Sequence, residues 1–384
     1  MHKNIKNVLL LLCITAVCTF LTACGKEKNQ TEPEQPADQK TEQEPEQETK
    51  KAPDYPKETV KIGVEAYNIY DKDFIDLQEY FSYLSEHINV EFVYSDAIMS
   101  KRQEREFIDW CKEEGCVGFI GFYNESGIDQ AKRVTDHNMF YIDNGTVPEL
   151  YEEYKEQPYY LGSVSKKEFY YESGVALAQW VMAEQFQNII FAGGDNSLKD
   201  KLYGDIEQGF MDTLKGQQVN VTSLAGFPDE KFFEKQSEIL RDQNVDAVCS
   251  SYGEPSLWAE PMIAAGLQGI SKLGIQETVD ESLQGAFEEG DISYLVSENI
   301  YLYGIAAALI LNGVSGGQDV YREDGKALKI ENKPLVIDGE ESYLKQLEIR
   351  KEKEGFTAEV LLNLCVENNK DTNLDDLKQI IGQK

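Results

Sequence analysis

Short apolar runs alternate with amphipathic segments about every 25 residues from residue 60 onward, and this rhythm constrains the fold more than any other feature. The apolar runs have the length of strands, and the run at 117–122 is apolar throughout, as a strand covered on both faces should be. Between the runs, side chains such as Phe74, Leu77 and Phe81 fall on one face of a helix. Strands that alternate with helices predict an α/β fold with parallel sheets.

The rhythm completes one series near residue 143 and then restarts. The expected strands of the first series are 61–66, 90–94, 117–122 and 139–143, and those of the second are 160–164, 188–193, 219–223, 245–251 and 270–275. The chain after residue 59 is long enough for two domains of ordinary size. We therefore expect two successive, doubly wound α/β lobes.

Residues 1–23 have the pattern of a signal peptide. A basic run that ends at Lys6 precedes an apolar stretch, 8–20, which is too short to span a bilayer comfortably as a permanent anchor. Leu-Thr-Ala-Cys at 21–24 then has the pattern of a lipobox. We expect cleavage before Cys24 and lipidation of that residue, which would hold the chain on the outer face of a bacterial membrane. An uncleaved signal anchor is the alternative.

Residues 24–59 are expected to consist of the lipidated Cys24 and a disordered acidic tether. The tether is expected because Glu, Gln, Lys, Pro and Thr dominate this segment and no apolar cluster occurs in it. Over the whole chain, 69 acidic residues against 37 basic ones give a formal net charge of −32. Nucleic-acid binding requires a basic face, so this charge argues against a nucleic acid as partner. A self-repelling surface suits a protein that stays soluble at high local density, and we expect a monomer.

Cysteine spacing and motif context argue against an enzyme or a metal site. Beyond Cys24 the cysteines are Cys111, Cys116, Cys249 and Cys365, for which we expect buried free thiols, with a Cys111–Cys116 pair as the alternative. No CxxC pair occurs, so a structural zinc site is not expected. The segment 313–317 matches G-x-S-x-G, yet it follows an expected helix, whereas a nucleophile elbow follows a strand. We therefore expect no catalysis, no metal and no cofactor.

Two stretches carry a resemblance to a known family over roughly residues 60–318. The more specific stretch is Leu273-Gly-Ile-Gln-Glu277 followed by 283–299 and 303–309, and the other runs from Ser173-Gly174 to Gly209-Phe210. In the order and spacing of their expected strands and helices, they resemble type I periplasmic binding proteins of the ribose and galactose group. The resemblance implies two α/β lobes that hold a small-molecule solute in the cleft between them.

The resemblance also implies that the chain crosses three times between an N-terminal and a C-terminal lobe. The implied crossings lie near 144–146, 276–279 and 313–317. The implied lobes are residues 60–144 plus 280–312, and residues 145–279 plus 313–384. In this division the segment 326–384 is a tail longer than the family usually has.

Ligands of open α/β sheets bind beyond the carboxyl ends of the strands, so residues that end strands should line a cleft between two lobes. The residues at the expected strand ends are mainly aromatic, amide and acidic. They are Tyr67, Asn68, Tyr70, Tyr123, Asn124, Asp143, Asn144, Asp195, Tyr203, Tyr252, Glu254, Gln276 and Glu298. For several tyrosines the alternative is packing at the surface, and for Asp143 it is capping of the turn that follows.

Sugar-binding relatives place the sugar between aromatic rings and hold its hydroxyls with Arg, Asn, Asp and Gln, and the resemblance assigns the family's aspartate to Asp143. The usual arginine beside it is Asn144 here, and the family's glutamine is Glu298. Tyr252 and Gln276 replace two further polar residues of the family. Fewer arginines, with more tyrosines and carboxylates, would suit a sugar-like ligand that also carries a cationic or aromatic group.

In such a binding module, the ligand contacts both lobes only in the closed state and so shifts the equilibrium toward closure. The resemblance implies that an ABC importer receives the solute. A sensor kinase or chemoreceptor that reads the closed shape is the alternative partner, and a surface protein without a transport role is a third interpretation.

Overall fold

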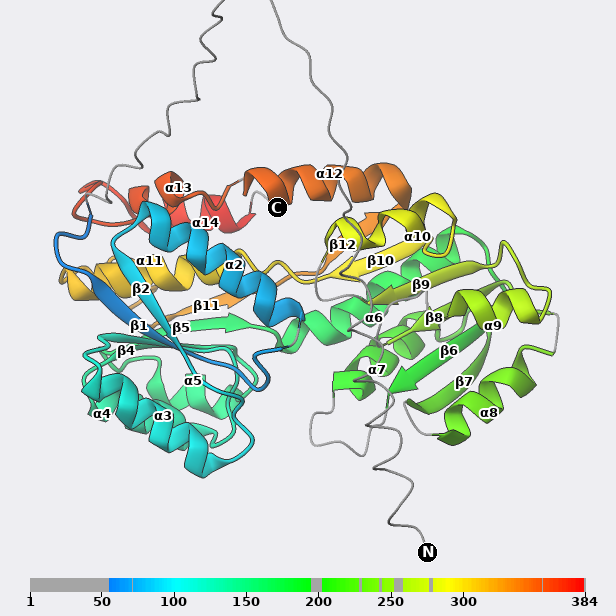
Figure 1. Cartoon of the computed structure of the whole chain (residues 1–384), viewed down its shortest axis with the longest axis horizontal. Helices are drawn as coiled ribbons and strands as arrows, with labels where there is room; N and C mark the ends of the chain where they lie inside the picture. Colours follow the sequence, from blue (N-terminus) through cyan, green and yellow to red (C-terminus); the bar gives the residue numbers. More distant parts are fainter. Residues whose placement is uncertain are drawn as a thin grey trace, which may run out of the picture. The chain divides into compact units, whose positions relative to one another are not determined.

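The computed structural model describes residues 55–70, 72–194, 202–227, 230–241, 244–251, 258–275, 279–353 and 355–382 (Figure 1). All of them belong to the compact unit Lys51–Lys384. Their strands form two six-stranded sheets, and helices cover each sheet. No helix among these residues is both long and apolar enough to cross a membrane.

The first sheet has the strand order β11-β5-β4-β3-β1-β2, and its neighbouring strands are parallel throughout. Its strands are β1 (Val60–Glu65), β2 (Val90–Tyr94), β3 (Gly118–Gly121), β4 (Phe140–Asp143), β5 (Tyr160–Ser165) and β11 (Leu328–Glu331). Its helices are α2 (Lys72–His87), α3 (Lys101–Glu113), α4 (Ile128–Asp136), α5 (Pro148–Tyr154), α11 (Leu302–Val314), α13 (Ala358–Asn363) and α14 (Leu374–Gly382).

Helices cover both faces of the first sheet. One apolar core joins the sheet to α2, α11, α13 and α14, and a second core joins it to α3, α4 and α5. Burial on both faces explains why the strand residues of β3 are all apolar or glycine and all buried.

The second sheet has the order β12-β10-β9-β8-β6-β7, and β12 alone runs antiparallel to its neighbour, β10. Its strands are β6 (Asn188–Gly194), β7 (Asn220–Phe227), β8 (Ala247–Ser250), β9 (Ser271–Ile275), β10 (Tyr294–Ser297) and β12 (Leu335–Asp338). Its helices are α6 (Lys167–Ala183), α7 (Leu202–Leu214), α8 (Glu230–Ile239), α9 (Ala259–Ala264), the 3₁₀ turn η2 (Glu281–Leu283), α10 (Gln284–Glu288) and α12 (Gly339–Glu352).

Three apolar cores surround the second sheet. Helices α6 and α7 share one core with it, α8 and α9 share another, and α10 and α12 share a third through Phe287 and Tyr343, whose stacked rings lie 4.5 Å apart. Each sheet with its helices is called a lobe below. The expected architecture of two doubly wound α/β lobes is thus confirmed.

The chain passes between the lobes at segments other than the expected ones. It leaves the first lobe after Ser165 of β5, returns after β10 at residues 298–301, and leaves again between β11 and β12 at residues 332–334. After α12 it returns once more, because α13 and α14 belong to the core of the first lobe. The described part of the chain therefore has four crossings, where the resemblance implied three.

Two of the expected crossings lie inside the first lobe. Residues 144–146 form a turn in which the backbone N–H of Thr146 donates to Asn144 Oδ1 at 3.2 Å, and α5 of the same lobe follows. Residues 313–317 end α11, and the chain continues to β11 of the same lobe. The third, 276–279, lies largely outside the described residues. Polar and glycine-bearing segments are typical of turns within a lobe as well as of hinges, which explains the difference.

The lobe boundaries change accordingly. Residues 280–297 belong to the second lobe, because Leu283 and Phe287 pack in its core and β10 lies in its sheet. The expected tail is divided between the lobes: β12 and α12 belong to the second lobe, whereas Phe356, α13 and α14 pack against the first. Its apolar residues are spread over two cores, so no single pattern in the sequence marks this division.

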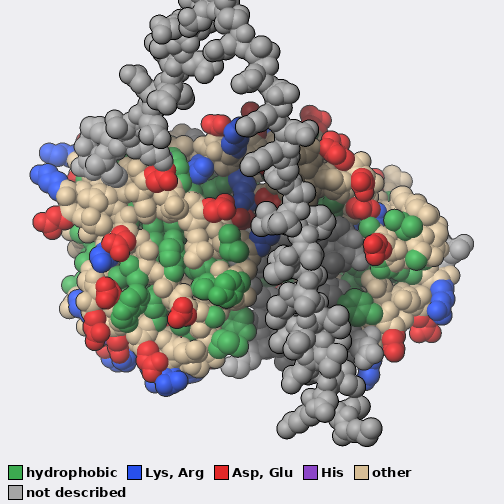
Figure 2. Space-filling view, viewed as in Figure 1, with side chains coloured by type: hydrophobic (Ala, Val, Ile, Leu, Met, Phe, Trp, Pro, Cys, Tyr) green, Lys and Arg blue, Asp and Glu red, His purple; other side chains and the backbone are tan. Residues whose placement is uncertain are grey.

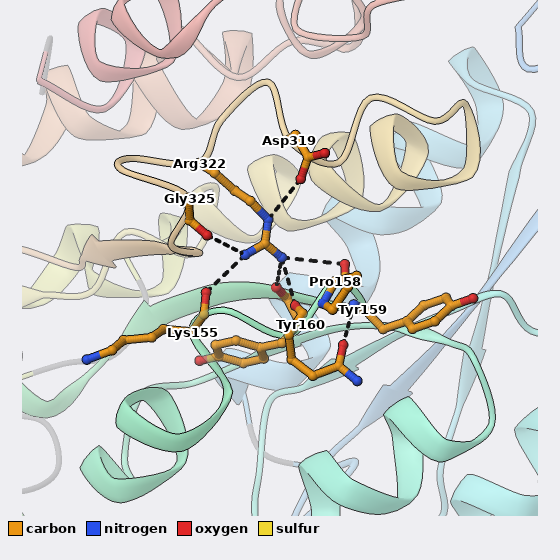
Figure 3. A network of polar contacts seen from close by, with 8 residues as sticks. Lys155, Pro158, Tyr159, Tyr160, Asp319, Arg322 and Gly325 are labelled. Carbon is orange, nitrogen blue, oxygen red and sulfur yellow. Dashed lines mark hydrogen bonds and ion pairs between the residues drawn. The ribbon is translucent and has the colours of Figure 1, made fainter.

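Arg322 fixes the segment before β11 against the segment before β5 (Figure 3). Its guanidinium donates to the carbonyl oxygens of Lys155 at 2.9 Å, Gln157 at 2.7 Å and Tyr160 at 2.8 Å. Its Nε also lies 3.3 Å from a carboxylate oxygen of Asp319. These bonds satisfy backbone carbonyls at the edge of the first sheet, where β11 pairs with β5.

The cysteines Cys111, Cys116, Cys249 and Cys365 are buried and free, as the sequence predicts. Burial in apolar surroundings raises the pKa of the Cys365 thiol to about 12, because the thiolate would lose its hydration. A thiol in this state is a packing group with little nucleophilic character.

Helices α6 and α7 approach each other closely at two glycines. A Cβ atom on Gly174 would lie 2.0 Å from the carbonyl oxygen of Ile206, and one on Gly209 would lie 2.1 Å from that of Tyr171. Both distances are far inside van der Waals contact. The two glycines are therefore needed because they let the backbones of the helices meet.

The variant Gly174→Ala should destabilise the protein, because the added methyl group must push α7 away from α6. We expect the free energy of unfolding to fall by about 1–3 kcal/mol, the usual cost of overpacking. Gly285→Ala in α10 is the matched control, because nothing lies within 4 Å of its Cβ position and Ala favours a helix. Urea denaturation followed by circular dichroism measures both variants, and equal midpoints would contradict the close approach.

Candidate functional site

The parallel strands of the first sheet end at one edge, and the residues that follow β1, β3, β4 and β5 lie there. Phe122 connects several of them: Lys166 Nζ lies 4.4 Å from its ring centroid, and Asn144 Nδ2 donates to its carbonyl oxygen at 3.0 Å. The rings of Tyr67 and Tyr123 lie 5.1 Å apart with an interplanar angle of 51°. Of the expected site residues, the structure thus brings Tyr67, Tyr123 and Asn144 to this edge.

Tyr67 and Tyr123 form an aromatic pair that is partly open to solvent. Tyr67 is 48% exposed, and Tyr123 is half-buried. The hydroxyl of Tyr123 donates to Glu125 Oε2 at 2.6 Å, which fixes the direction of the ring. Hydrophobic side chains also gather on the face of the first lobe in Figure 2. A partly exposed pair of rings offers an apolar surface on which a ligand can stack.

Asp143 is buried, and its carboxylate is used inside the lobe. The hydroxyl of Tyr160 donates to Oδ1 at 2.7 Å, and the backbone N–H of Gly145 donates to Oδ2 at 3.0 Å. Loss of hydration raises the pKa of this carboxyl to about 6, although both hydrogen bonds oppose the rise. This arrangement fits the turn-capping role that was the alternative to ligand binding.

Two expected amides also bond locally. Asn144 Oδ1 accepts from the backbone N–H of Thr146 and, at 2.7 Å, from its hydroxyl. Asn124 Oδ1 accepts from the backbone N–H of Gly127 at 2.5 Å, and its Nδ2 donates to the Gly127 carbonyl at 3.2 Å. Both side chains therefore shape the turns that follow β3 and β4.

The remaining candidates are divided between an exposed turn and residues that are not described. Asn68 and Tyr70 lie in the turn after β1, where the backbone N–H of Tyr70 donates to Asn68 Oδ1 at 3.1 Å and the Tyr70 side chain is 79% exposed. Outside the described residues lie Cys24, Asp195, Tyr252, Glu254, Gln276 and the side chain of Tyr203.

Glu298 lies in a buried polar group with Lys166 and Asn332, which we call the crossing cluster. Lys166 Nζ lies 2.7 Å from Glu298 Oε2, and Asn332 Nδ2 donates to Glu298 Oε1 at 2.9 Å. The side chains of Lys166 and Glu298 are only 8% and 1% exposed. The three residues follow β5, β10 and β11, so one polar cluster connects three of the four described crossings.

Lys166 and Asn332 were not among the site residues predicted from the sequence. Each lies in a short polar segment beside further charged residues, as in ordinary surface loops, and lysine is almost never fully buried without a partner. Glu298 itself was the indication in the sequence, because it follows an apolar strand and a carboxylate buried there needs a cation or hydrogen-bond donors nearby. Nothing in the sequence indicates which cation that is.

No family model matches the sequence, and no curated protein matches it. Solved structures do match. A carbohydrate transporter from Acidothermus cellulolyticus 11B, in complex with myo-inositol, has a TM-score of 0.58 at 14% identity, covering 77% of this chain and 99% of that one. The periplasmic binding protein component of the arabinose ABC transporter from Shewanella sp. ANA-3 has a TM-score of 0.54 at 16% identity, covering 79% and 98%. The Escherichia coli transcriptional repressor ascG has a TM-score of 0.56 at 12% identity, covering 73% and 98%.

The chain has the type I periplasmic binding protein fold. In this periplasmic binding protein fold, the crossing cluster lies where the lobes are joined, and the aromatic pair lies at the strand ends of the first lobe. Transport proteins and a repressor share the fold, so the fold alone does not define the function. Among the described residues, no group of three or more His, Cys, Asp or Glu side chains is placed to hold a metal ion.

The variant Glu298→Ala should be strongly destabilising, because it leaves the ammonium group of Lys166 buried without its carboxylate. We expect a loss of about 3–5 kcal/mol in the free energy of unfolding, as for other broken buried pairs. Glu168→Ala is the matched control, since Glu168 pairs with Lys329 at 2.8 Å but both side chains are over a third exposed. That loss should stay below about 1 kcal/mol. Chemical denaturation compares the two, and similar losses would contradict a buried cluster.

Proposed function

We propose that this protein is an extracytoplasmic solute-binding lipoprotein that captures a small, polar, sugar-like ligand between its lobes and presents it to an ABC importer. The observation that carries the proposal is the partly exposed Tyr67–Tyr123 pair at the strand ends of a type I periplasmic binding protein fold. Solved structures with this fold include a carbohydrate transporter in complex with myo-inositol and a component of an arabinose ABC transporter bound to L-arabinofuranose. Strand ends are also where open α/β sheets bind ligands.

The arrangement of charges refines the kind of ligand that we propose. Lys166, which is paired with Glu298, already lies over the ring of Phe122, so that face of the ring is not open to a ligand. The Tyr67 and Tyr123 rings are partly open to solvent, and rings of this kind stack on apolar faces or attract cations. The proposed ligand therefore has a hydroxyl-rich body and places any cationic or aromatic group over these two rings.

The membrane partner and the anchor are also proposals. A role with an importer is supported by the neighbour that is a component of an ABC transporter. The alternative is a module that senses the same ligand for a membrane receptor. A role on DNA, as in the repressor of the same fold, is disfavoured by the formal net charge of −32.

Ligand binding should be detectable as stabilisation. A ligand at about 100 times its dissociation constant should raise the free energy of unfolding by about 2.7 kcal/mol. Thermal unfolding with a panel of neutral sugars, polyols, nucleosides and amines tests this. If no compound of the panel raises the melting temperature, the solute-binding proposal loses its support. If only neutral sugars raise the melting temperature, the proposal that the ligand carries a cationic or aromatic group is wrong.

For a compound that binds, Tyr67→Ala should weaken the affinity by about tenfold or more, equivalent to about 1.4 kcal/mol. Trp110→Ala is the matched control, because Trp110 is similarly exposed, at 44% against 48%, but lies near the end of α3, toward the opposite edge of the sheet. Isothermal titration calorimetry compares the variants. Equal affinities of both variants would place the ligand away from the aromatic pair.

Replacing the lipidation residue tests the anchor separately. Cys24→Ser should move the protein from the membrane fraction to the soluble fraction, because the acyl chains supply the proposed membrane affinity. Cell fractionation and labelling with a fatty acid analogue measure this, with Cys249→Ser as the control for an unrelated cysteine. A variant that stays in the membrane fraction would contradict lipidation at Cys24.

A further inference from the structure

A buried polar network lies beneath the turn that carries Tyr123. It consists of Glu65 at the end of β1, Glu104 on α3, Gln130 on α4 and Tyr141 on β4, each with an exposure of 0%. Polar groups so deeply buried are costly unless they are hydrogen-bonded to one another. None of the residues is among the candidates chosen from the sequence, and none forms an ion pair with a cation in the described part of the chain.

Gln130 is the centre of the network. Its Nε2 donates to Glu65 Oε2 at 2.8 Å and to Glu104 Oε2 at 3.1 Å, and its Oε1 accepts from the hydroxyl of Tyr141. Gly121 makes room for this amide, because a Cβ atom there would lie 2.8 Å from Gln130 Oε1. The amide thus brings two carboxyl groups onto one nitrogen.

The same network holds the turn 123–127. Glu104 Oε2 accepts from the backbone N–H groups of Glu125 at 2.7 Å and Ser126 at 3.2 Å. Gln130 Nε2 also lies 3.1 Å from the carbonyl oxygen of Tyr123. The backbone of the turn is therefore held by Glu104 and Gln130, and Gln130 in turn joins it to Glu65.

The two remaining oxygens, Glu65 Oε1 and Glu104 Oε1, are buried and have no donor in the network. One proton between the two carboxyl groups would satisfy both. Burial raises the pKa of Glu65 well above its usual value, and the adjacent Glu104 raises it further. The pKa of Glu104 is also raised by burial, but the backbone N–H groups of the turn favour its charged form. The proton therefore belongs on Glu65.

We propose that Glu65 and Glu104 share one proton at neutral pH, and that this shared proton positions the turn 123–127 and, with it, the ring of Tyr123. Glu65 and Glu104 are then positioning residues that act through Tyr123. The effect on a ligand rests on the function proposed above, whereas the effect on the turn does not.

The groups around Glu65 reinforce the need for this proton. Glu104 and Cys111 approach it from α3, Glu125 from the turn and Tyr141 from β4. None of these groups is cationic, so a second negative charge would be repelled by Glu104 and Glu125 and compensated by neither Cys111 nor Tyr141. When the pH rises through the pKa of Glu65 in the folded protein, the pair loses its proton and the turn loses part of its support. The sign follows from linkage: the folded state retains this proton longer than the unfolded state, so stability falls as the pH rises.

Hydrogen exchange tests the inference without any ligand. In the full chain, protection of the Glu125 and Ser126 amides, corrected for the intrinsic pH dependence of exchange, should fall about tenfold from about pH 6 to about pH 9. Glu65→Gln supplies a permanent donor of the same shape, so its protection should change by less than about twofold over that range. Glu65→Ala should already lack this protection at the lower pH. Glu113→Gln, on the exposed face of α3, should follow the unchanged protein.

Three outcomes would overturn the inference: amide protection in the wild-type protein that does not depend on pH, a fall in protection in Glu65→Gln equal to that of the wild type, or a loss of fold in Glu65→Gln.

Calorimetry with myo-inositol and L-arabinose at the same two pH values tests the effect on a ligand. An affinity that falls about tenfold in the unchanged protein but not in Glu65→Gln is expected. If hydrogen exchange behaves as expected but neither compound binds, the result counts against the proposed binding of these sugars and polyols. The shared proton would still be supported. A probe that binds equally at both pH values would refute the positioning of Tyr123.

Discussion

A buried charge on Glu298 is the constraint on which the joining of the two lobes depends. An ion pair inside a protein stabilises it only where the remaining lone pairs and protons are also satisfied. Here Lys166 and Asn332 occupy both carboxylate oxygens. Asn332 then extends the cluster to the backbone, since its N–H donates to the Ser165 carbonyl at 3.1 Å and its Oδ1 accepts from the N–H of Asn299 at 3.3 Å. Three crossings are thus tied to one another as well as to their lobes.

The fourth crossing adds contacts that do not pass through this cluster. Arg350, near the end of α12, lies 2.7 Å from Asp76 of α2 and donates to the carbonyl oxygen of Val279 at 2.7 Å. Lys72 of α2 lies 2.7 Å from Asp280. Exposed pairs contribute little, about 0–1 kcal/mol, but the Asp76 side chain is only 7% exposed. Hinge closure of the kind that binding proteins use would have to preserve or exchange these contacts. The segment 326–384 therefore contributes contacts between the lobes through Arg350, and it completes the core of the first lobe through α13 and α14.

Periodicity predicted the lobes because burial on both faces of a sheet leaves a continuous apolar run. The strands β1, β3 and β4 lie within one residue of their expected positions for that reason. The crossings had no such basis. Residues 144–146 and 332–334 are both short and polar, yet the first is a turn stabilised by Asn144 and the second passes between lobes. Only their hydrogen-bond partners distinguish the two segments. Asn144 bonds to the backbone of its own turn, whereas Asn332 bonds to Glu298, which lies far away in the sequence.

The candidate site shows the same limit at the level of side chains. Position after a strand predicted that Tyr67, Tyr123 and Asp143 would share an edge, but it does not predict which of them faces solvent. Asp143 turns inward to Tyr160, whereas Tyr67 remains half exposed. Glu65 and Glu104, which position the turn that carries Tyr123, lie one layer deeper, where two carboxyl groups without a cation need a proton between them. The aromatic residues of such a site can therefore be predicted from their positions after strands. The buried polar network beneath them cannot, because only the packing of β1 against α3 and α4 brings its residues together.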